Sequence, residues 1–235
     1  MRALGTRARL VVPAPSDVLT PTITALVVLA LGSLGLLAAL AHRHLLSWDR
    51  PVRSGLRGID SDAFGALMDA ATKFGSRWVI AALTVSAALL AWRRCRQLAI
   101  VLVVAFPAAL VLELTLKALI DRPRPSFALG FGASFPSGHV LAATAFWGLI
   151  PPLVFIITRS RAAWSVSVAA IAVVLLGVGT SRVYLGAHWP SDVVGAYFGG
   201  AIFLLVAEWA VRRPWRRLRC EACDLHPLGS RGLGS

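Results

Sequence analysis

Six apolar stretches dominate this chain of 235 residues and restrict what it can fold into. They lie near residues 21–41, 78–92, 97–119, 139–158, 163–180 and 193–211. A helix of about 20 apolar residues crosses roughly 30 Å of hydrocarbon, so these stretches predict membrane-spanning helices. The second stretch is short, but Trp78 and Trp92 near its ends are typical of anchors at the membrane interface. We therefore expect an all-α bundle of six transmembrane helices.

The composition agrees with a membrane protein and argues against a soluble nucleic-acid binder. Charged residues make up 15% of the chain, against about 25% in soluble domains. The mean hydropathy is +0.72, and the formal net charge is +13. That charge alone could indicate nucleic-acid binding. Most of the arginines, however, lie in short clusters at the ends of the apolar stretches, as is usual at a membrane surface. We expect no nucleic-acid partner.

The arginine clusters also predict how the chain is oriented. The N-terminal segment, "WRRCR", "TRSR" and "RRPWRRLR" all fall on one side of a six-helix topology. The positive-inside rule makes that side cytoplasmic, as in a multi-pass protein of the plasma (inner) membrane. The opposite, extracytoplasmic side receives the segment 42–77, which mixes arginines with aspartates. This segment includes a short amphipathic helix in "IDSDAFGALMDAATKF".

Three regions follow from this topology. Residues 1–20 form a cytoplasmic N-terminal segment, 21–212 the membrane domain, and 213–235 a basic cytoplasmic tail that is expected to be disordered. The first apolar stretch resembles a signal peptide, but it exceeds the usual apolar core of about 7–15 residues, so we expect an uncleaved helix. In the tail, Cys220 and Cys223 could supply half of a zinc site. The second ligand pair is missing, and a solvated thiol pair is the simpler interpretation.

Three groups of polar residues converge on the predicted outer side. They are Lys117 with Arg124 in "KALIDRPRP", Ser137, Gly138 and His139 in "PSGH", and Arg182, His188 and Asp192 in "SRVYLGAHWPSD". Ionisable residues next to membrane helices are costly and usually functional. Fixed cations, two imidazoles, a carboxylate and the starts of two helices suit a phosphate ester better than other common substrate groups.

The cations and the start of the fourth helix predict a phosphate-binding site. Arginine forks match phosphate oxygens in a bidentate manner, and lysine adds a point charge. Ser137 is a natural N-cap for the helix, and Gly138 allows a close approach of the backbone. The free amides of the first helical turn then point at an anion.

The two histidines can divide the catalytic work. One imidazole could attack phosphorus while the other protonates the departing alcohol oxygen. Asp192 lies four residues after His188 and just past Pro190, a good first residue for the sixth helix. Its carboxylate can accept the Nδ1 proton and leave Nε2 of His188 free as the nucleophile. His139 has no such carboxylate nearby, which favours the role of general acid.

These residues resemble the signature of the type 2 phosphatidic acid phosphatase superfamily. This superfamily includes membrane lipid phosphatases, bacterial acid phosphatases, glucose-6-phosphatase and vanadium haloperoxidases. Its three parts match Lys117 with Arg124–Pro125, "PSGH" at 136–139, and Ser181–Arg182 with His188 and Asp192. The resemblance spans residues 117–192 by motif, and the six-helix topology extends it over most of the chain.

The resemblance also implies a role for each matched residue. Lys117, Arg124 and Arg182 would bind phosphate, with help from Ser137 and the Gly138 backbone. His188 would be the nucleophile, oriented by Asp192, and His139 the general acid. The resemblance implies a metal-independent reaction, and the sequence offers no cluster of carboxylates on the outer face that would hold Mg²⁺. We expect no metal and no cofactor.

From these observations we expect an integral membrane phosphatase that acts on a lipid phosphate or pyrophosphate through a phosphohistidine intermediate. Candidate substrates are phosphatidic acid, phosphatidylglycerol phosphate and polyprenyl pyrophosphates such as undecaprenyl pyrophosphate. They would reach the site laterally from the outer leaflet, beside the segment 42–77. Two alternatives stay open. One is a phosphotransferase that uses another lipid or a sugar as acceptor, and the other is an anion transporter, which usually places polar residues at the midplane.

Several residues outside the motifs carry further expectations. Glu113 and Asp121 lie four residues on either side of Lys117, so helical geometry could pair either of them with it. Arg122 is not a motif position and is expected in a solvated loop or in contact with lipid headgroups. The pair Pro151–Pro152 predicts a kink near the middle of the fourth span.

Overall fold

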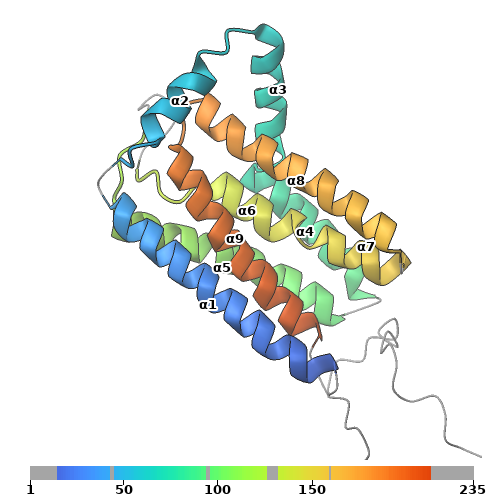
Figure 1. The fold of residues 1–235 in the computed structure, drawn as a ribbon. Coiled ribbons are helices and arrows are strands. Elements are labelled where there is room, and N and C mark those ends of the chain that lie inside the picture. Colours follow the sequence, from blue (N-terminus) through green and yellow to red (C-terminus); the bar gives the residue numbers. More distant parts are fainter. Residues whose placement is uncertain (1–14, 43–44, 94–95, 126–131, 159, 213–235) are drawn as a thin grey trace, which may run out of the picture.

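The chain folds into helices connected by short segments (Figure 1). A computed structural model describes residues 15–42, 45–93, 96–125, 132–158 and 160–212. Within these ranges the elements are α1 (Pro15–Ala41), α2 (Asp49–Arg57), α3 (Asp62–Lys73), α4 (Arg77–Trp92), α5 (Arg96–Ile120), α6 (Gly138–Trp147), α7 (Ile150–Thr158), α8 (Arg161–Tyr184) and α9 (Pro190–Arg212). The predicted all-α fold is confirmed. The predicted C-terminal tail with its two cysteines, and most of the predicted N-terminal segment, lie outside the described residues.

The helices agree with a multi-pass membrane protein. Among the described residues, five segments are long and apolar enough to cross a membrane: Thr24–Ala41, Arg96–Ile120, Gly138–Phe155, Arg161–Tyr184 and Pro190–Ala207. A sixth span requires α3 and α4 together, and these two helices meet at a bend of 44°. The expected second span is thus present as α4, but its 16 residues cover only about 24 Å at the helical rise. The segment 42–77 holds α2 in addition to the expected amphipathic helix, which is α3.

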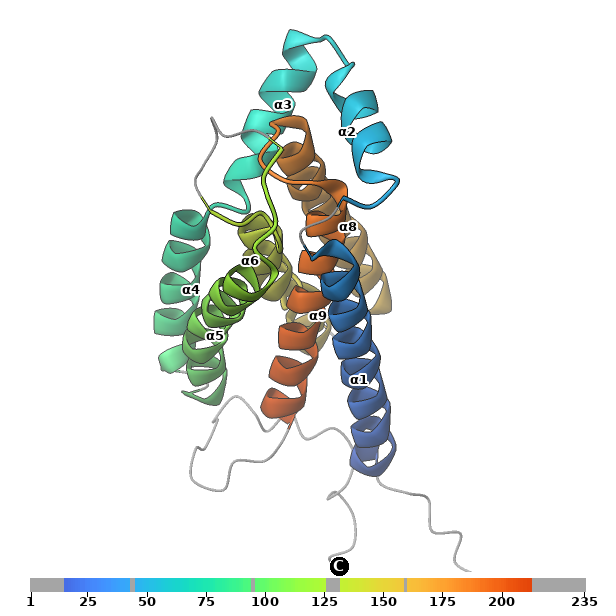
Figure 2. The same cartoon turned by 90° about the vertical axis from the view of Figure 1, so that its left-hand side faces the viewer.

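The two ends of the bundle differ. Figures 1 and 2 show α2 and α3 at one end, together with the end of α8 and the start of α9. The start of α1 and the end of α9 lie at the opposite end (Figure 2). We call the first of these the α2–α3 end. The helix termini next to the basic sequence clusters therefore gather away from it, as the orientation argument requires.

The kink expected at Pro151–Pro152 is a break between two helices. α6 ends at Trp147 and α7 begins at Ile150, just before the prolines. Proline has no N–H, and its ring clashes with the preceding turn of a helix, so α6 cannot continue through this pair. In the first turn of α7 no intrahelical donor is needed, and the prolines are tolerated there.

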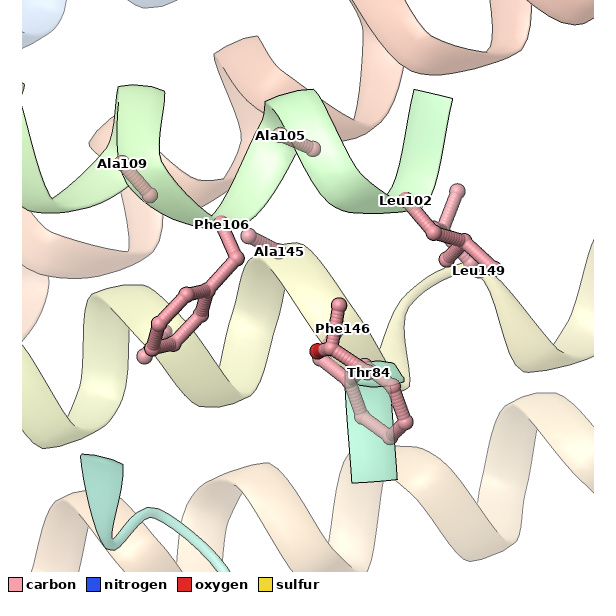
Figure 3. A pocket seen from close by; sticks show the side chains of 9 residues that line it. Thr84, Leu102, Ala105, Phe106, Ala109, Ala145, Phe146 and Leu149 are labelled. Carbon is pink, nitrogen blue, oxygen red and sulfur yellow. The ribbon is translucent and has the colours of Figure 1, made fainter. Parts of the chain in front are cut away.

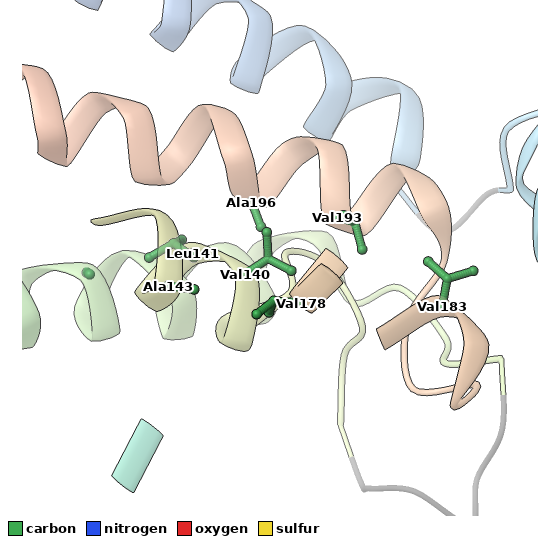
Figure 4. Close-up of a cluster of buried hydrophobic side chains, with 8 residues drawn as sticks. Val140, Leu141, Ala143, Val178, Val183, Val193 and Ala196 are labelled. Atoms are coloured by element: carbon green, nitrogen blue, oxygen red, sulfur yellow. The ribbon is translucent and has the colours of Figure 1, made fainter. Parts of the chain in front are cut away.

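Small side chains let the central helices approach one another. α4 packs against α5 and α6 and leaves an apolar crevice lined by Thr84, Leu102, Phe106, Ala142 and Leu149, among others (Figure 3). We call it the α4–α6 crevice. A buried core joins α5, α6, α8 and α9 nearer the α2–α3 end. It consists of Ala109, Val140, Leu141, Ala143, Val178, Val183, Val193 and Ala196 (Figure 4).

Gly195 of α9 offers a test of this packing. An added Cβ there would lie 2.5 Å from Cζ of Phe135, whose side chain is fully buried. We expect Gly195→Ala to lower the free energy of unfolding by about 1–3 kcal/mol, because the enclosed ring has no room to move. The measurement is the midpoint of thermal unfolding in detergent.

Gly35→Ala on α1 is the matched control. Nothing lies within 4 Å of the methyl group that it adds, and both variants make the same change within a helix. The control should keep or slightly raise the thermal midpoint, since alanine favours a helix over glycine. Equal midpoints for the two variants would show that the described packing of Phe135 against α9 is wrong.

Candidate active site

The structure brings the polar residues selected from the sequence together at the α2–α3 end. Lys117 lies in the last turn of α5 and Arg182 in the last turn of α8. Arg124 lies in the connection after α5, Ser137 and His139 at the start of α6, and His188 and Asp192 at the start of α9. His139 interacts electrostatically with His188, Arg182 and Lys117, and Arg124 interacts with Asp192 and Arg182. One cation-rich site thus contains both imidazoles.

His188 is buried, and two oxygen atoms set the orientation of its ring. Nδ1 lies 2.8 Å from the carbonyl oxygen of Ser134 and 3.6 Å from Oδ2 of Asp192. A carbonyl oxygen only accepts hydrogen bonds, so Nδ1 carries the proton and Nε2 keeps its lone pair. The expected carboxylate is therefore present, but at 3.6 Å it lies beyond hydrogen-bond distance. The nearer acceptor, Ser134, was not predicted.

The surroundings keep His188 uncharged near neutral pH. Burial lowers its pKa below the ordinary value of 6.5. The carboxylate of Asp192 opposes this shift, while the positive charges of Arg124 and Arg182 add to it. A neutral imidazole with a free Nε2 is the form that a nucleophile requires.

Arg124 and Arg182 are held by uncharged oxygen atoms. Arg124 donates from Nε to the Gly132 carbonyl and from Nη1 to the Ala187 carbonyl, both at 3.2 Å. Arg182 donates from Nη1 to Oγ1 of Thr72 at 2.9 Å, and its Nε is buried without a hydrogen-bond partner in the described parts of the chain. Burial lowers the pKa of Arg124, although an arginine stays charged at neutral pH. Neither guanidinium has a carboxylate in ion-pair range among the described residues, so both can bind an anion.

Glu113 fixes the position of Lys117. The Lys117 Nζ donates to Oε1 of Glu113, one helical turn earlier and one of the two expected acidic neighbours. An added Cβ at Gly138 would overlap the carboxylate of Glu113. Gly138 is therefore needed for the packing of this carboxylate, a reason that differs from the expected approach of an anion to the backbone.

Ser137 occupies the N-cap position of α6 as expected, but its side chain does not cap the helix. Its Oγ is buried and has no hydrogen-bond partner within the described residues. Its backbone N–H donates to the Asp192 carbonyl at 3.1 Å, which fixes the start of α6 against the start of α9. A buried hydroxyl without a partner costs free energy. An anion at the first turn of α6 would satisfy both this hydroxyl and the unpaired amides of the turn.

Arg122 lies in the protein interior, and the prediction of a solvated or headgroup-bound side chain is wrong. The side chain is fully buried. Nη1 donates to Oδ1 of Asp192 at 2.5 Å and to Oγ of Ser191 at 2.7 Å, and Nη2 donates to Oδ2 of Asp49. Two carboxylates from α2 and α9 neutralise the guanidinium, which is the condition under which an arginine can be buried.

Asp49 connects α2 to the start of α9. Its Oδ1 accepts hydrogen bonds from the backbone N–H and the hydroxyl of Ser191, at 2.9 and 2.7 Å, and its Oδ2 accepts from Leu46 N at 2.9 Å. Asp49, Arg122, Ser191 and Asp192 form what we call the buried charge network. Its contacts join residues 73 and 142 positions apart, so no local motif could reveal them. The only sequence signal for Arg122 was that Arg122–Pro123 repeats the dipeptide of the motif pair Arg124–Pro125 directly after it.

The buried charge network predicts a large stability effect for Arg122→Gln. The substitution leaves Asp49 and Asp192 buried without their counter-ion, which should cost about 3–5 kcal/mol. The thermal midpoint of the variant in detergent measures this loss. Arg50→Gln, on an exposed arginine next to Asp49, should stay close to wild type. An Arg122→Gln variant as stable as Arg50→Gln would refute the network.

Comparison with known proteins supplies the family. Residues 96–215, just over half of the chain, match the PAP2 superfamily, and they include all three motif groups. The chain is 31% identical over 144 residues to undecaprenyl-diphosphatase of Sulfolobus acidocaldarius, and this match covers 57% of the chain and 65% of the relative. It is 35% identical over 105 residues to phosphatidylglycerophosphatase B of Bacillus subtilis, and this match covers 41% of the chain and 50% of the relative. The chain thus spans between half and two thirds of the length of these relatives.

A solved structure shares the fold. It is the crystal structure of the first transmembrane PAP2 type phosphatidylglycerolphosphate phosphatase from Bacillus subtilis. The TM-score is 0.71 at 22% sequence identity, and the match covers 81% of this chain and 98% of that one. The helical bundle is therefore that of a transmembrane PAP2 protein. On the family match and the shared fold together, this chain belongs to the PAP2 superfamily.

Proposed function

We propose that the protein is a membrane phosphatase that hydrolyses a lipid phosphate or pyrophosphate. One observation carries this proposal. His188 is held neutral with Nε2 free, beside Arg124 and Arg182, which have no carboxylate partner in the described part of the chain. The names of the relatives, an undecaprenyl-diphosphatase and a phosphatidylglycerophosphatase, support the same substrate class.

The arrangement allows a two-step reaction. Nε2 of His188 attacks phosphorus, the bond from phosphorus to the leaving oxygen breaks, and His139 gives that oxygen a proton. Water then attacks phosphorus of the phosphohistidine and gives up a proton to His139, while the bond from phosphorus to Nε2 breaks and inorganic phosphate leaves. The cations Lys117, Arg124 and Arg182 stabilise the negative charge that grows on the equatorial oxygens in the transition state.

Asp192 contributes mainly through its charge and through the backbone that it fixes. Throughout the first step the Nδ1 proton stays on the ring, directed at the Ser134 carbonyl. The Asp192 carboxylate at 3.6 Å stabilises the positive charge that the ring gains on attack. The same carboxylate accepts a hydrogen bond from the Trp189 N–H at 2.8 Å, so it also shapes the backbone next to the nucleophile.

We infer that the site faces the extracytoplasmic side of the plasma membrane. The helix termini next to the basic clusters lie at the opposite end of the bundle from α2 and α3 (Figure 2), and such clusters favour the cytoplasm. The charged site residues occupy helix ends and connections rather than the midplane. This placement favours a headgroup-directed enzyme over a transporter.

A panel of lipid phosphates tests the proposal. The purified protein in detergent should release inorganic phosphate from at least one of phosphatidic acid, phosphatidylglycerol phosphate and undecaprenyl pyrophosphate. Activity should persist in EDTA and be lost in orthovanadate, which mimics the trigonal-bipyramidal transition state. His188→Ala should lower turnover by about 10⁴-fold or more and abolish an acid-labile phosphoenzyme.

His42→Ala is the control, because His42 is exposed at the end of α1. It should leave turnover unchanged. A phosphoenzyme that survives His188→Ala contradicts the assigned nucleophile, and activity lost in EDTA contradicts a metal-free reaction. Product analysis with an added alcohol acceptor separates hydrolysis from phosphoryl transfer.

The lowered pKa of His188 predicts the pH dependence. The neutral imidazole is active, so activity is present above this pKa and falls as the pH drops through it. We expect the acid limb of kcat/KM, which reports free enzyme and free substrate, to lie below pH 6.5. Two lipid substrates with different phosphate pKa values identify which group causes the acid limb. A limb caused by ionisation of the substrate shifts with the pKa of its phosphate, whereas a limb caused by the enzyme stays at the same pH. An enzyme limb at or above pH 6.5 with both substrates would rule out a buried neutral nucleophile.

A further inference from the structure

A pocket next to the proposed catalytic residues contains a cation that belongs to none of the motifs. The pocket lies where α4, α5 and α6 meet, and Arg77, Phe106, Glu113 and His139 form part of its wall. Arg77 is the first residue of α4. It interacts electrostatically with His139 and also with Arg124. Arg77 therefore contributes to the electrostatic potential of the site, although it belongs to no sequence motif.

The guanidinium of Arg77 is accessible to a ligand. Its side chain is 56% exposed, and Nη2 lies 3.9 Å from Oε1 of Glu113, near the limit of an ion pair. Lys117 binds the same oxygen much more closely. Glu113 is thus committed to Lys117, and Arg77 keeps hydrogen-bond donors for an anion in the pocket.

The junction between α3 and α4 holds Arg77 at the edge of the site. Gly75 lies against the start of α6, and an added Cβ there would come within 2.9 Å of the His139 carbonyl oxygen. At the end of α3 and the start of the junction, Thr72 accepts a hydrogen bond from Arg182 and the Phe74 carbonyl accepts one from Trp147 Nε1, both at 2.9 Å. The bend between the two helices is therefore fixed against two elements of the site, and Arg77 follows directly after it.

The α4–α6 crevice adjoins the pocket, because Phe106, Ala109 and Ala142 line both of them. The crevice is lined almost entirely by carbon, with Thr84 as its polar residue (Figure 3). Such a surface suits a hydrocarbon chain and excludes a phosphate. A lipid with its reacting phosphate at the histidines and its chain directed toward the crevice would bring the junction of headgroup and chain into this pocket, where Arg77 lies.

We propose that Arg77 binds a second phosphate of the substrate, placed between the phosphate that is removed and the hydrocarbon chain. This inference rests on the proposed lipid phosphatase function. A pyrophosphate lipid has such a group, and so does a glycerophospholipid with both a diester and a terminal monoester phosphate. Phosphatidic acid and a polyprenyl monophosphate lack it. Arg77 then favours lipids with two phosphates over lipids with one.

The test compares a lipid that has this second phosphate with a lipid that lacks it. One pair is undecaprenyl pyrophosphate and undecaprenyl monophosphate, and the other is phosphatidylglycerol phosphate and phosphatidic acid with the same acyl chains. For each pair the ratio of kcat/KM, two-phosphate over one-phosphate lipid, is measured in wild type and in Arg77→Gln. A lost charge-assisted hydrogen bond should lower the ratio about tenfold or more. Arg77→Lys, which keeps the charge, should recover part of it.

Lys73→Gln is the matched control. Lys73 is an exposed cation in the last turn of α3, four residues before Arg77, and it does not line the pocket. It should leave the ratio unchanged if the effect belongs to the pocket and not to the general positive charge of this end. Because the same two histidines act on both lipids of a pair, a general disturbance of the site changes both rates and leaves the ratio.

Each outcome decides between the inference and its alternatives. A ratio that falls for both pairs, or for one pair, supports the inference, and a single affected pair identifies the type of lipid. An unchanged ratio in Arg77→Gln, or an equal fall in Lys73→Gln, overturns it while phosphate release by wild type upholds the phosphatase. Failure of wild type to release phosphate from any of the lipids overturns the proposed function itself. For a lipid that is cleaved too slowly, its inhibition constant as a competitor gives the same ratio.

Discussion

The buried guanidinium of Arg122 determines how the α2–α3 end is assembled. A charge in the interior is tolerated only with counter-charges and hydrogen bonds around it, and Asp49 and Asp192 supply them from two distant parts of the chain. These contacts fix the first turn of α9, and with it the backbone that carries His188. The Asp192 carbonyl in turn accepts from Ser137 N and fixes the start of α6. The positions of both histidines therefore depend on the buried charge network.

The apolar stretches predicted the helices well because a membrane-spanning helix must be long enough to cross the hydrocarbon layer. The apolar stretches coincide with α1, α4, α5, α8 and α9 to within a few residues at most of their ends. The motif residues were also found, because each motif is short in sequence and requires unusual residue types near an apolar stretch. Hydrophobicity does not indicate the angle between successive helices, however. It placed α3 and α4 in the chain but not the 44° bend between them, which depends on contacts with α6 and α8.

The part of the site that escaped prediction consists of long-range contacts. Arg122 lies between two motif positions, yet its partners Asp49 and Asp192 are 73 and 70 residues away. Arg77 lies in a segment where arginines are frequent, so only the pocket distinguishes it from its neighbours. The hydroxyl of Ser137 does not cap the helix as expected. In each case the sequence supplied the right residue type, and its function in the site depends on three-dimensional neighbours.

The acceptor at Nδ1 of His188 is a main-chain oxygen, and this has a consequence for genetic analysis. Every residue type carries a carbonyl group, so replacing the side chain of Ser134 leaves the acceptor in place. A scan of alanine variants would assign the orientation of the His188 ring to Asp192 alone, although the nearer contact, at 2.8 Å, comes from the peptide backbone. The orientation of His188 therefore depends in part on the course of the backbone rather than on the identity of a side chain. Variation among related sequences at position 134 would say little about its importance.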